Sequence, residues 1–259
     1  MSDAYEDASI TGEAAGLYES GIRKEVDEVL AKKAESVYPS YWRGSSAGYC
    51  MRKVIFDRLG VTPVRDDPRK YRVFESGHIF HEWFQRVTRE TKLSVAQEEE
   101  LVDDEILVVG HFDDLIYKNG KYIMYDYKTQ HSKAFWWAKK SGTSHKMSYT
   151  HRMQLGTYMY IKRKTLPELE EGRILKISKD DLSLLEQQLF YSPKLEKDII
   201  DYWTTLQAFW EAKKIPPCTC HEHDGGFMAR EQYNPYFYNG KPCSLDWYAR
   251  WKKEQAAKS

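Results

Sequence analysis

The stretch from Ile106 to Thr129 reads ILVVGHFDDLIYKNGKYIMYDYKT. Two apolar runs rich in β-branched and aromatic residues, Ile106–Tyr117 and Tyr122–Thr129, lie on either side of Asn119-Gly120. Asparagine and glycine both tolerate the positive φ of a type I′ turn, and Asn-Gly between apolar runs is the strongest short-range signal for a β-hairpin. We therefore expect an antiparallel hairpin at this point of the chain.

The register of this hairpin predicts a pair of acidic residues. With a two-residue loop at Asn119-Gly120, Asp113 lies directly opposite Asp126. Like charges directly opposed across two strands are destabilising, so such a pair favours a cation between the carboxylates. The same register places Asp114 opposite Tyr125, which selects Asp113 over its neighbour. We accordingly expect Asp114→Ala to leave most of the activity of the site.

A lysine, Lys128, is predicted to lie beside the two acidic residues. Because side chains alternate along a strand, Asp126 and Lys128 project from the same face. A lysine there can donate to an attacking water or stabilise charge on a phosphate. A divalent ion held by oxygen ligands suits phosphodiester hydrolysis, because it polarises the phosphate and lowers the pKa of a bound water. The alternative is an exposed sheet face on which two acids and a lysine balance one another.

Two predicted helices carry further polar residues. A helix over Tyr71–Glu90 places His81 one turn after Gly77, on the same face. A second helix, within 148–164, places Gln154 and Tyr158 one turn apart. Taken alone, a histidine on a helix is more often a surface or core residue than a ligand, and without the hairpin the second pair indicates a polar helix edge.

The remaining pattern indicates a mixed α/β class with one modest sheet. We expect a helix from about Leu17 to Glu35, with Ile22, Val26, Val29 and Leu30 as its buried stripe. The segment Asp181–Lys214 is predicted to be helical and broken or kinked at Pro193. The tail from Pro216 shows no clean period. The other expected elements are a helix over Met51–Leu59, an extended segment over Leu93–Val102 and a strand over Gly172–Ser178.

Composition limits the class of protein. Hydrophobic residues make up 41% and charged residues 30% of the 259 residues, and the formal net charge is zero. A neutral chain does not bind nucleic acid by overall charge, although a local basic groove is compatible with it. The sequence has no apolar run of about 18 residues and no secretory signal at its acidic N-terminus, so we expect a cytoplasmic protein. Its four cysteines are then reduced thiols or metal ligands.

The ordered set of motifs resembles the RecB-like branch of the PD-(D/E)XK nucleases. The matching segments, which cover roughly Tyr71 to Tyr160, are Gly77-His78-Ile79-Phe80-His81, Gly110-His111-Phe112-Asp113, Asp126-Tyr127-Lys128-Thr129 and Gln154 through Tyr158. The resemblance implies a restriction-endonuclease-like core, in which a small central sheet with an antiparallel hairpin is flanked by helices.

The resemblance also implies a role for each matched residue. His81, Asp113, Asp126 and the backbone carbonyl of Tyr127 would bind Mg²⁺ or Mn²⁺. Lys128 would be the catalytic lysine. Gln154 and Tyr158 look like the family's Q-x-x-x-Y element, which positions the DNA strand and the lysine.

The cysteines extend the resemblance to the iron–sulfur-containing exonucleases associated with CRISPR systems and phages. In that family one cysteine precedes the nuclease core and three lie near the C-terminus, which is the order of Cys50, Cys218, Cys220 and Cys243. A [4Fe–4S] cluster is therefore expected. The C-x-C pair is tighter than the usual C-x-x-C, and His221 and His223 follow it closely, so a zinc site is the competing expectation.

A basic aromatic segment follows the hairpin. Phe135, Trp136, Trp137, Lys139 and Lys140 are expected to contact DNA, since aromatic faces stack on bases and lysines follow the phosphates. An ordinary core helix with a basic edge is the alternative.

These features lead to a functional hypothesis: a metal-dependent DNA exonuclease that acts at single-stranded ends, in recombination, repair or CRISPR adaptation. The exonuclease activity and the biological setting rest on the resemblance. A structure-specific endonuclease and a non-catalytic, metal-stapled DNA-binding module are the alternatives. We expect one compact unit with an N-terminal helical segment (1–70), a nuclease core (71–180) and C-terminal helices with a Cys-rich tail (181–259).

Overall fold

The structure is a computed structural model that describes residues 22–33, 40–64, 68–140, 142, 146–223, 226 and 229–257. By contacts within the chain it divides into two units, each described by itself. The first comprises Met1–Val37 and Asp67–Ile79, and the second comprises Tyr38–Asp66 and Phe80–Ser259. Helix α4 (Arg69–Glu90) begins in the first unit and continues into the second.

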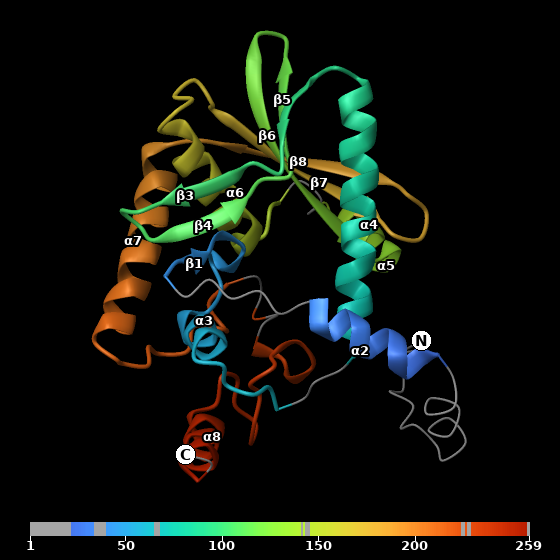
Figure 1. Cartoon of the computed structure of the whole chain (residues 1–259). Coiled ribbons are helices and arrows are strands. Elements are labelled where there is room, and N and C mark those ends of the chain that lie inside the picture. The colour runs from blue at the N-terminus through green and yellow to red at the C-terminus, as the bar shows by residue number, and fades with distance from the viewer. Residues whose placement is uncertain are drawn as a thin grey trace. The chain divides into compact units, whose positions relative to one another are not determined.

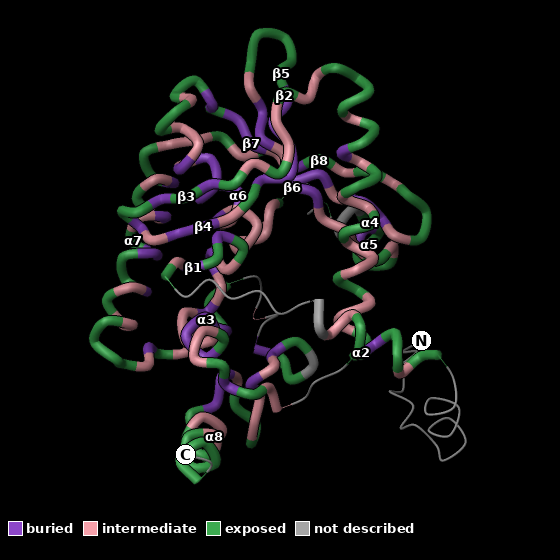
Figure 2. The backbone as a smooth tube through the Cα atoms, in the orientation of Figure 1, coloured by how far each residue is buried: buried purple, intermediate pink, exposed green. Residues whose placement is uncertain are grey.

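The first unit contains helix α2 (Arg23–Lys33) and the start of α4. Its clearest contact is polar: buried Asp27 accepts hydrogen bonds from Arg72 Nη1 at 2.6 and 2.8 Å. The apolar stripe that is predicted to be buried is instead exposed at Ile22, Val26 and Val29. Figure 2 shows α2 with exposed and half-buried segments and little that is buried. The prediction of a helix is confirmed over Arg23–Lys33, whereas the prediction of its buried face is wrong.

A five-stranded mixed sheet forms the centre of the second unit (Figure 1). The predicted hairpin is confirmed, because Lys118 pairs with Lys121 and the antiparallel register continues to Asp114 opposite Tyr125. The β6–β7 pair is parallel and the other three pairs are antiparallel. In spatial order the strands are β2 (Ser94–Gln97), β5 (Asp114–Lys118), β6 (Lys121–Gln130), β7 (Glu171–Ser178) and β8 (Leu184–Phe190).

The strand predicted over Ile106–Tyr117 is not continuous. Its first half, β4 (Val108–His111), belongs to a separate three-stranded sheet with β1 (Trp42–Arg43) and β3 (Glu100–Asp103). The chain leaves this sheet at Phe112, whose side chain is fully buried, and enters β5 at Asp114. The predicted register is correct, but the β5–β6 ladder ends at Asp114 opposite Tyr125, and Asp113 occupies the bend one position before it.

One helix of the second unit packs against strands of both sheets and against a second helix in the core. Helix α6 (Tyr149–Arg163) begins at Ser148, whose hydroxyl accepts from the backbone N–H of His151. Leu155 and Met159 of this helix are fully buried in the same cluster as Trp203 of α7 (Pro193–Glu211). The other helices are α3 (Met51–Arg58), α5 (Ser132–Lys140) and α8 (Leu245–Ala256).

The helix predicted over Asp181–Lys214 is correct only in its second half. Pro193 starts α7, where a missing backbone N–H costs nothing. The first half forms β8, an edge strand that pairs with β7 from Glu171 opposite Phe190 to Ile177 opposite Leu184. Its Leu-Glu-Gln-Gln-Leu sequence favours a helix, and the pairing with β7 overrides that preference.

The predicted class is confirmed. Among the described residues, seven α-helices and two sheets form a mixed α/β structure, with the hairpin inside the larger sheet and helical and Cys-rich segments added to it. Within the described residues, no helix is both long enough and apolar enough to cross a lipid bilayer.

Candidate active site and cysteine cluster

Two buried carboxylates meet where the bend before β5 approaches β6. Asp113 is 8% exposed and Asp126 is 2% exposed. One oxygen of Asp113, Oδ2, accepts a hydrogen bond from the backbone N–H of Tyr127. Burial raises the pKa of Asp126 to about 6, the charge of Lys128 lowers it and the charge of Asp113 raises it again. The bend therefore brings the acidic pair together without a direct cross-strand pairing.

Lys128 is the cation of this cluster. Its Nζ lies 2.7 Å from Asp126 Oδ2, as expected for two residues on the same face of β6. Burial lowers the pKa of Lys128, but the charges of Asp126 and Asp113 outweigh that effect and raise it. The amine therefore stays protonated at neutral pH, and it can act as a hydrogen-bond donor and a positive charge but not as a base.

Helix α6 contributes two polar side chains to the acidic pair. Gln154 Nε2 donates to Asp126 Oδ1 at 3.0 Å and lies 3.4 Å from the Tyr158 hydroxyl. Tyr158 is buried, and its burial raises the pKa of its hydroxyl above the usual value. The negative charge of Asp126 raises this pKa as well. The spacing of four residues thus places both side chains on the face that meets β6.

His81 approaches the pair from α4. Its Nδ1 lies 3.4 Å from Asp113 Oδ1, and its ring meets the Tyr127 ring edge-on at 6.0 Å between centroids. Burial lowers the pKa of His81, but the hydrogen bond to Asp113 and the charge of Asp113 outweigh this effect. The net result is a raised pKa. The structure therefore brings together all six side chains that the sequence placed at the site: His81, Asp113, Asp126, Lys128, Gln154 and Tyr158.

The donors at this site suit a hard divalent cation. Asp126 Oδ2 is fully buried and accepts no hydrogen bond of good geometry from a described residue, although the Lys128 ammonium is close. Two carboxylates and one imidazole, with the carbonyl of Tyr127 between the acid and the lysine, form an oxygen-rich ligand set. Such a set of buried oxygen donors beside one imidazole fits Mg²⁺ or Mn²⁺.

Asp114 has a larger structural role than its place in the sequence indicated. Its carboxylate is fully buried and accepts from four groups: the hydroxyls of Thr88, Ser94 and Tyr127 at 2.5, 2.6 and 2.9 Å and Gln97 Nε2 at 2.9 Å. The predicted register is correct, and the prediction that Asp114→Ala keeps most of the activity stays a prediction, while the burial of this carboxylate gives it a structural role. It anchors the Tyr127 ring, and thus β6, to α4 and β2.

A second lysine and a histidine flank the acidic pair. Lys176 of β7 pairs with Lys128 of β6, and partners in parallel strands share a face of the sheet. His151 of α6 has a buried Nδ1 without a hydrogen-bond partner among the described residues. Burial, with the charges of Lys128 and Lys176, lowers the pKa of His151 to about 3. This face of the sheet is therefore positively charged next to the carboxylates.

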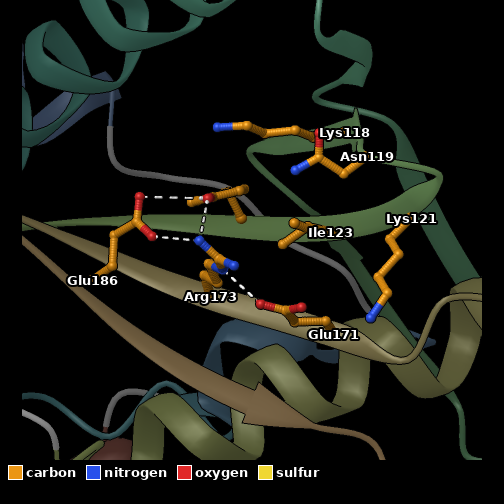
Figure 3. A pocket seen from close by; sticks show the side chains of 8 residues that line it. Lys118, Asn119, Lys121, Ile123, Glu171, Arg173 and Glu186 are labelled. Atoms are coloured by element: carbon orange, nitrogen blue, oxygen red, sulfur yellow. Dashed lines mark hydrogen bonds and ion pairs between the residues drawn. The ribbon is translucent and has the colours of Figure 1, made fainter.

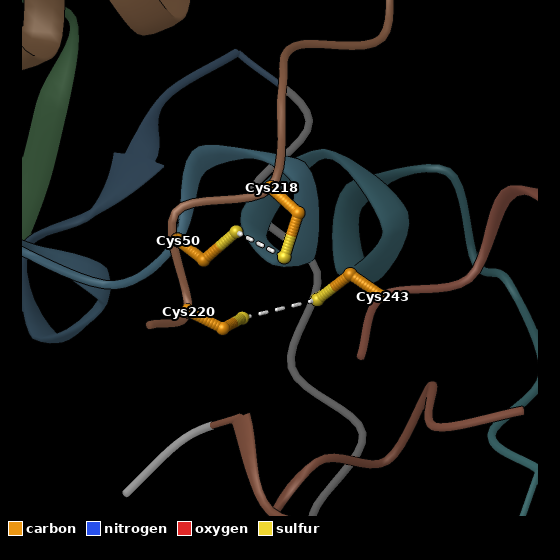
Figure 4. Close-up of side chains that lie close together, drawn as sticks. All are labelled: Cys50, Cys218, Cys220 and Cys243. Carbon is orange, nitrogen blue, oxygen red and sulfur yellow. Dashed lines mark hydrogen bonds between the residues drawn. The ribbon is translucent and has the colours of Figure 1, made fainter. Parts of the chain in front are cut away.

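The four cysteines converge at a separate centre (Figure 4). Cys50 lies at the start of α3, and the other three come from the C-terminal tail. All four Sγ atoms lie within 4.8 Å of one another, with Cys50–Cys218 at 3.9 Å and Cys220–Cys243 at 3.5 Å. All four are free thiols. The predicted grouping of these cysteines is therefore confirmed.

The spacing of the sulfurs bears on which metal they fit. Around a single tetrahedral ion with bonds of about 2.3 Å, neighbouring sulfurs lie about 3.8 Å apart. The Cys50–Cys218 and Cys220–Cys243 separations are close to this value, and the other sulfur pairs lie within 4.8 Å. In a [4Fe–4S] cluster each thiolate binds its own iron and points outward from a four-iron core. The cysteines would have to move apart to hold such a cluster.

Helix α5 carries the segment expected to contact DNA. Phe135 is buried, whereas Trp136 is 55% exposed and lies under the Lys140 ammonium, 4.9 Å from the ring centroid. The side chains of Trp137 and Lys139 lie outside the described residues. The exposed aromatic ring and its cation are compatible with stacking on a base, and the buried phenylalanine attaches the helix to the core.

A hollow of about 370 Å³ lies beside the hairpin tip (Figure 3). Arg173 within it is bound by two carboxylates, Glu171 at 2.6 Å and Glu186 at 2.7 Å. Lys118 and Lys121 line its rim. None of the six side chains of the candidate active site lines this hollow, so it is separate from the acidic pair and its lysine.

Comparisons with known proteins place the chain among distant structural neighbours. No family profile and no curated protein matches the sequence. The structure is similar to SSO0001 (TM-score 0.48, 17% identity, covering 76% of this chain and 95% of that one). It is also similar to the alkaline exonuclease LHK-Exo from Laribacter hongkongensis (0.46, 15%, 72% and 93%) and to a phage-related exonuclease from Haemophilus somnus 129PT (0.40, 16%, 63% and 78%).

Proposed function

We propose that this chain is a metal-dependent nuclease that hydrolyses phosphodiester bonds in DNA. The observation that carries the proposal is the convergence of buried Asp113 and Asp126, with protonated Lys128 against Asp126 and His81 against Asp113. A buried pair of like charges is costly unless it holds a cation, so such a pair is a candidate for function. A charged lysine next to it can stabilise the negative charge that develops on the phosphate oxygens during hydrolysis.

The residues that would hold Mg²⁺ or Mn²⁺ are His81, Asp113, Asp126 and the Tyr127 carbonyl. When bound, the ion polarises the phosphate and lowers the pKa of a coordinated water. Gln154 fixes the rotamer of Asp126 by donating to Oδ1, which leaves Oδ2 toward Lys128. The Tyr127 N–H fixes Asp113 in the same way. The protein thus orients both carboxylates before any ligand arrives.

Lys128 would donate to a phosphate oxygen and stabilise the charge that develops there. Lys176 and His151, on the same side of the sheet, extend the polar surface along the path of a DNA strand. Trp136 and Lys140 of α5, with Trp137 and Lys139, would hold the single strand by stacking and by phosphate contacts. In this proposal the enzyme is an exonuclease that acts at single-stranded ends, in recombination, repair or CRISPR adaptation.

End-labelled single- and double-stranded DNA with Mg²⁺ or Mn²⁺ tests the activity. We expect the enzyme to release short products from single-stranded ends and to leave covalently closed circular DNA uncleaved. Cleavage of the closed circle would establish an endonuclease. Binding of labelled DNA without cleavage under either metal would establish a non-catalytic binding module and overturn the enzymatic assignment.

The metal requirement has its own test. Excess chelator is expected to abolish cleavage, and Ca²⁺ is expected to support DNA binding without turnover, because it is larger and less strict in geometry than Mg²⁺. Full cleavage by protein whose metal has been shown by elemental analysis to be removed would contradict the mechanism.

We further propose that Cys50, Cys218, Cys220 and Cys243 hold a structural metal centre. The family resemblance implies a [4Fe–4S] cluster, and the sulfur separations favour a single zinc ion. Hydrolysis of a phosphodiester needs no electron transfer, so in either case the centre fastens the tail to α3. Iron, sulfide and zinc analysis of protein purified without oxygen distinguishes the two occupants.

A further inference from the structure

The cysteine centre has a polar neighbour that no motif indicated. Asn234 is 4% exposed, and its side chain lies beside two of the sulfurs. Its Nδ2 is 3.4 Å from Cys220 Sγ and 3.4 Å from Cys243 Sγ. A carboxamide placed so close to two sulfur atoms is a candidate donor to both.

The orientation of this carboxamide is fixed by the backbone. Asn234 Oδ1 accepts from the N–H of Tyr236 at 3.0 Å and from the N–H of Cys243 at 3.4 Å. Both backbone groups are donors only, so the oxygen must face them and the NH₂ group must face the sulfurs. The Cys243 thiol also lies 3.8 Å from this oxygen, a contact that a metal-bound thiolate cannot make as a donor.

The sulfurs receive further donors from the chain. The backbone N–H of Thr219 donates to Cys50 Sγ at 3.4 Å. Arg52 donates to the carbonyls of Pro216 and Cys243 at 2.7 and 3.3 Å, so it ties together the two segments that carry the C-terminal cysteines. Asn234 is distinct from these groups because one side chain reaches two sulfurs and also holds the turn that ends at Cys243.

We propose that Asn234 is a positioning residue of the cysteine centre, which donates its N–H groups to the metal-bound sulfurs of Cys220 and Cys243 and thereby sets how tightly the metal is held. The inference rests on the metal centre proposed above. Four thiolates around a divalent ion leave a net negative charge in a buried place, and N–H donors offset it. Groups that hydrogen-bond to metal ligands typically change metal affinity by about 10- to 100-fold.

Replacing the NH₂ group of Asn234 with an oxygen tests whether this side chain donates to the sulfurs. Asn234→Asp keeps the shape and the acceptor for the two backbone N–H groups, but it replaces the NH₂ donor with a charged oxygen facing the sulfurs. The matched control is Asn239→Asp, which makes the same change at an exposed position of the same tail. Asn234→Ala removes both the donor and the acceptor, and it separates the effect of charge from the effect of the lost donor.

The measurement uses the full chain, stripped of metal and titrated anaerobically with Co²⁺, whose sulfur-to-metal charge-transfer absorption reports thiolate ligation. Asn234→Asp is expected to weaken Co²⁺ binding by about 10- to 100-fold. Asn234→Ala should weaken it less, and Asn239→Asp should match the unaltered chain. Folded Asn234→Asp protein that binds Co²⁺ as tightly as the unaltered chain overturns the proposal.

Failure of the underlying metal site gives a different result. If the unaltered chain shows no thiolate charge-transfer absorption with Co²⁺, and Cys220→Ser changes nothing, the centre itself is wrong and the role of Asn234 is overturned with it. If Cys220→Ser abolishes the absorption while Asn234→Asp leaves it and the affinity unchanged, the centre stands and only the role of Asn234 falls.

Discussion

At the scale of the residue, Asp126 joins most of the contacts of the candidate active site. Its Oδ1 accepts from Gln154, its Oδ2 lies beside Lys128, and the charge of Asp113 acts on it. We expect Asp113→Ala, Asp126→Ala and Lys128→Ala each to lower the rate of DNA cleavage by at least about 10²- to 10³-fold. Single-turnover cleavage of end-labelled DNA measures this.

The matched control for these variants is Glu186→Gln, which removes an exposed carboxylate of β8 outside the acidic pair. It should cleave at the unaltered rate. A folded Asp126→Ala protein that retains full cleavage would show that the buried pair has a purely structural role.

The raised pKa of Asp126 predicts how metal binding depends on pH. In the metal-free protein this carboxyl takes up a proton near pH 6, mainly because of burial. A metal ion must displace that proton and also the proton of His81, whose pKa is raised by the hydrogen bond and charge of Asp113. Mn²⁺ affinity should therefore fall by at least about tenfold per pH unit below pH 6 and rise more gently above it, until His81 is neutral. Calorimetric titration of chelator-treated protein from pH 5 to 8 tests this.

The same shift has the opposite sign for stability. A protonated Asp126 favours the metal-free fold below the unfolded pKa near 3.8, and this contribution is lost as the pH rises through about 6. Saturating Mn²⁺ should restore stability above pH 6. An Asp126→Asn variant should lose the stability effect and keep only the part of the affinity effect that His81 contributes. A Mn²⁺ affinity of the unaltered chain that is flat from pH 5 to 8 would contradict the assignment.

Asp114 carries a prediction that differs from the one made from the sequence. Removing its carboxylate leaves the hydroxyl of Tyr127, two other hydroxyls and one amide without their shared acceptor. Each buried donor left unsatisfied costs about 1–3 kcal/mol. We expect Asp114→Ala to lower the unfolding midpoint in urea well below that of Asp113→Ala. Equal midpoints would show that the network contributes little.

At the scale of the element, the sequence predicted well where local chemistry decides. The Asn-Gly turn determined the hairpin, and Ser148 with its following apolar residues determined α6. The prediction failed where tertiary pairing decides. Nothing local shows that Phe112 turns the chain out of one sheet, or that 184–190 forms an edge strand against β7. The break at Asp113 therefore could not be read from alternation alone.

The packing of α6 depends on two glycines that lie against Tyr158. A Cβ added at Gly110 of β4 would lie 2.6 Å from the Tyr158 ring, and one at Gly44 would lie 2.4 Å from it. Contacts this short force the ring to move. We expect Gly110→Ala to displace Tyr158 and lower both stability and cleavage, by about 1–3 kcal/mol in unfolding free energy.

A double-mutant cycle checks this cause. Tyr158→Ala removes the ring, so Gly110→Ala should cost much less in that background than in the unaltered chain. Equal costs in the two backgrounds would show that the alanine acts through the backbone of β4 and not through the tyrosine.

At the scale of the whole molecule, the site is assembled from distant parts of the chain. The order of the motifs grouped His81, the two aspartates and Gln154, and the cysteine order grouped Cys50 with residues about 170 positions later. The sequence could not indicate Asn234, because an asparagine in an aperiodic tail carries no local signal. Nor could it indicate which contacts link the cysteine centre to the active site.

One such link is a ring contact between the cysteine loop and α6. His223 lies three residues after Cys220, and its ring stacks on Tyr149 with centroids 3.7 Å apart and an interplanar angle of 19°. Tyr149 is the first residue of α6, the helix that carries Gln154 to Asp126. Loss of metal from the cysteines would loosen the loop, release this stack and weaken the placement of Gln154.

We therefore expect His223→Ala to lower the rate of DNA cleavage modestly, by about two- to tenfold, the range that a stacked ring pair contributes. The Mg²⁺ concentration needed for half-maximal rate should change little, since no proposed metal ligand is altered. His221→Ala, at an exposed position of the same loop, is the matched control and should leave the rate unchanged.

Single-turnover rates are to be compared with the cysteine metal present and after its removal. If the stack transmits the effect, metal removal slows the unaltered chain but slows His223→Ala much less, because the two changes act on the same contact. Fully additive losses would show that the cysteine centre acts on the nuclease site by another route.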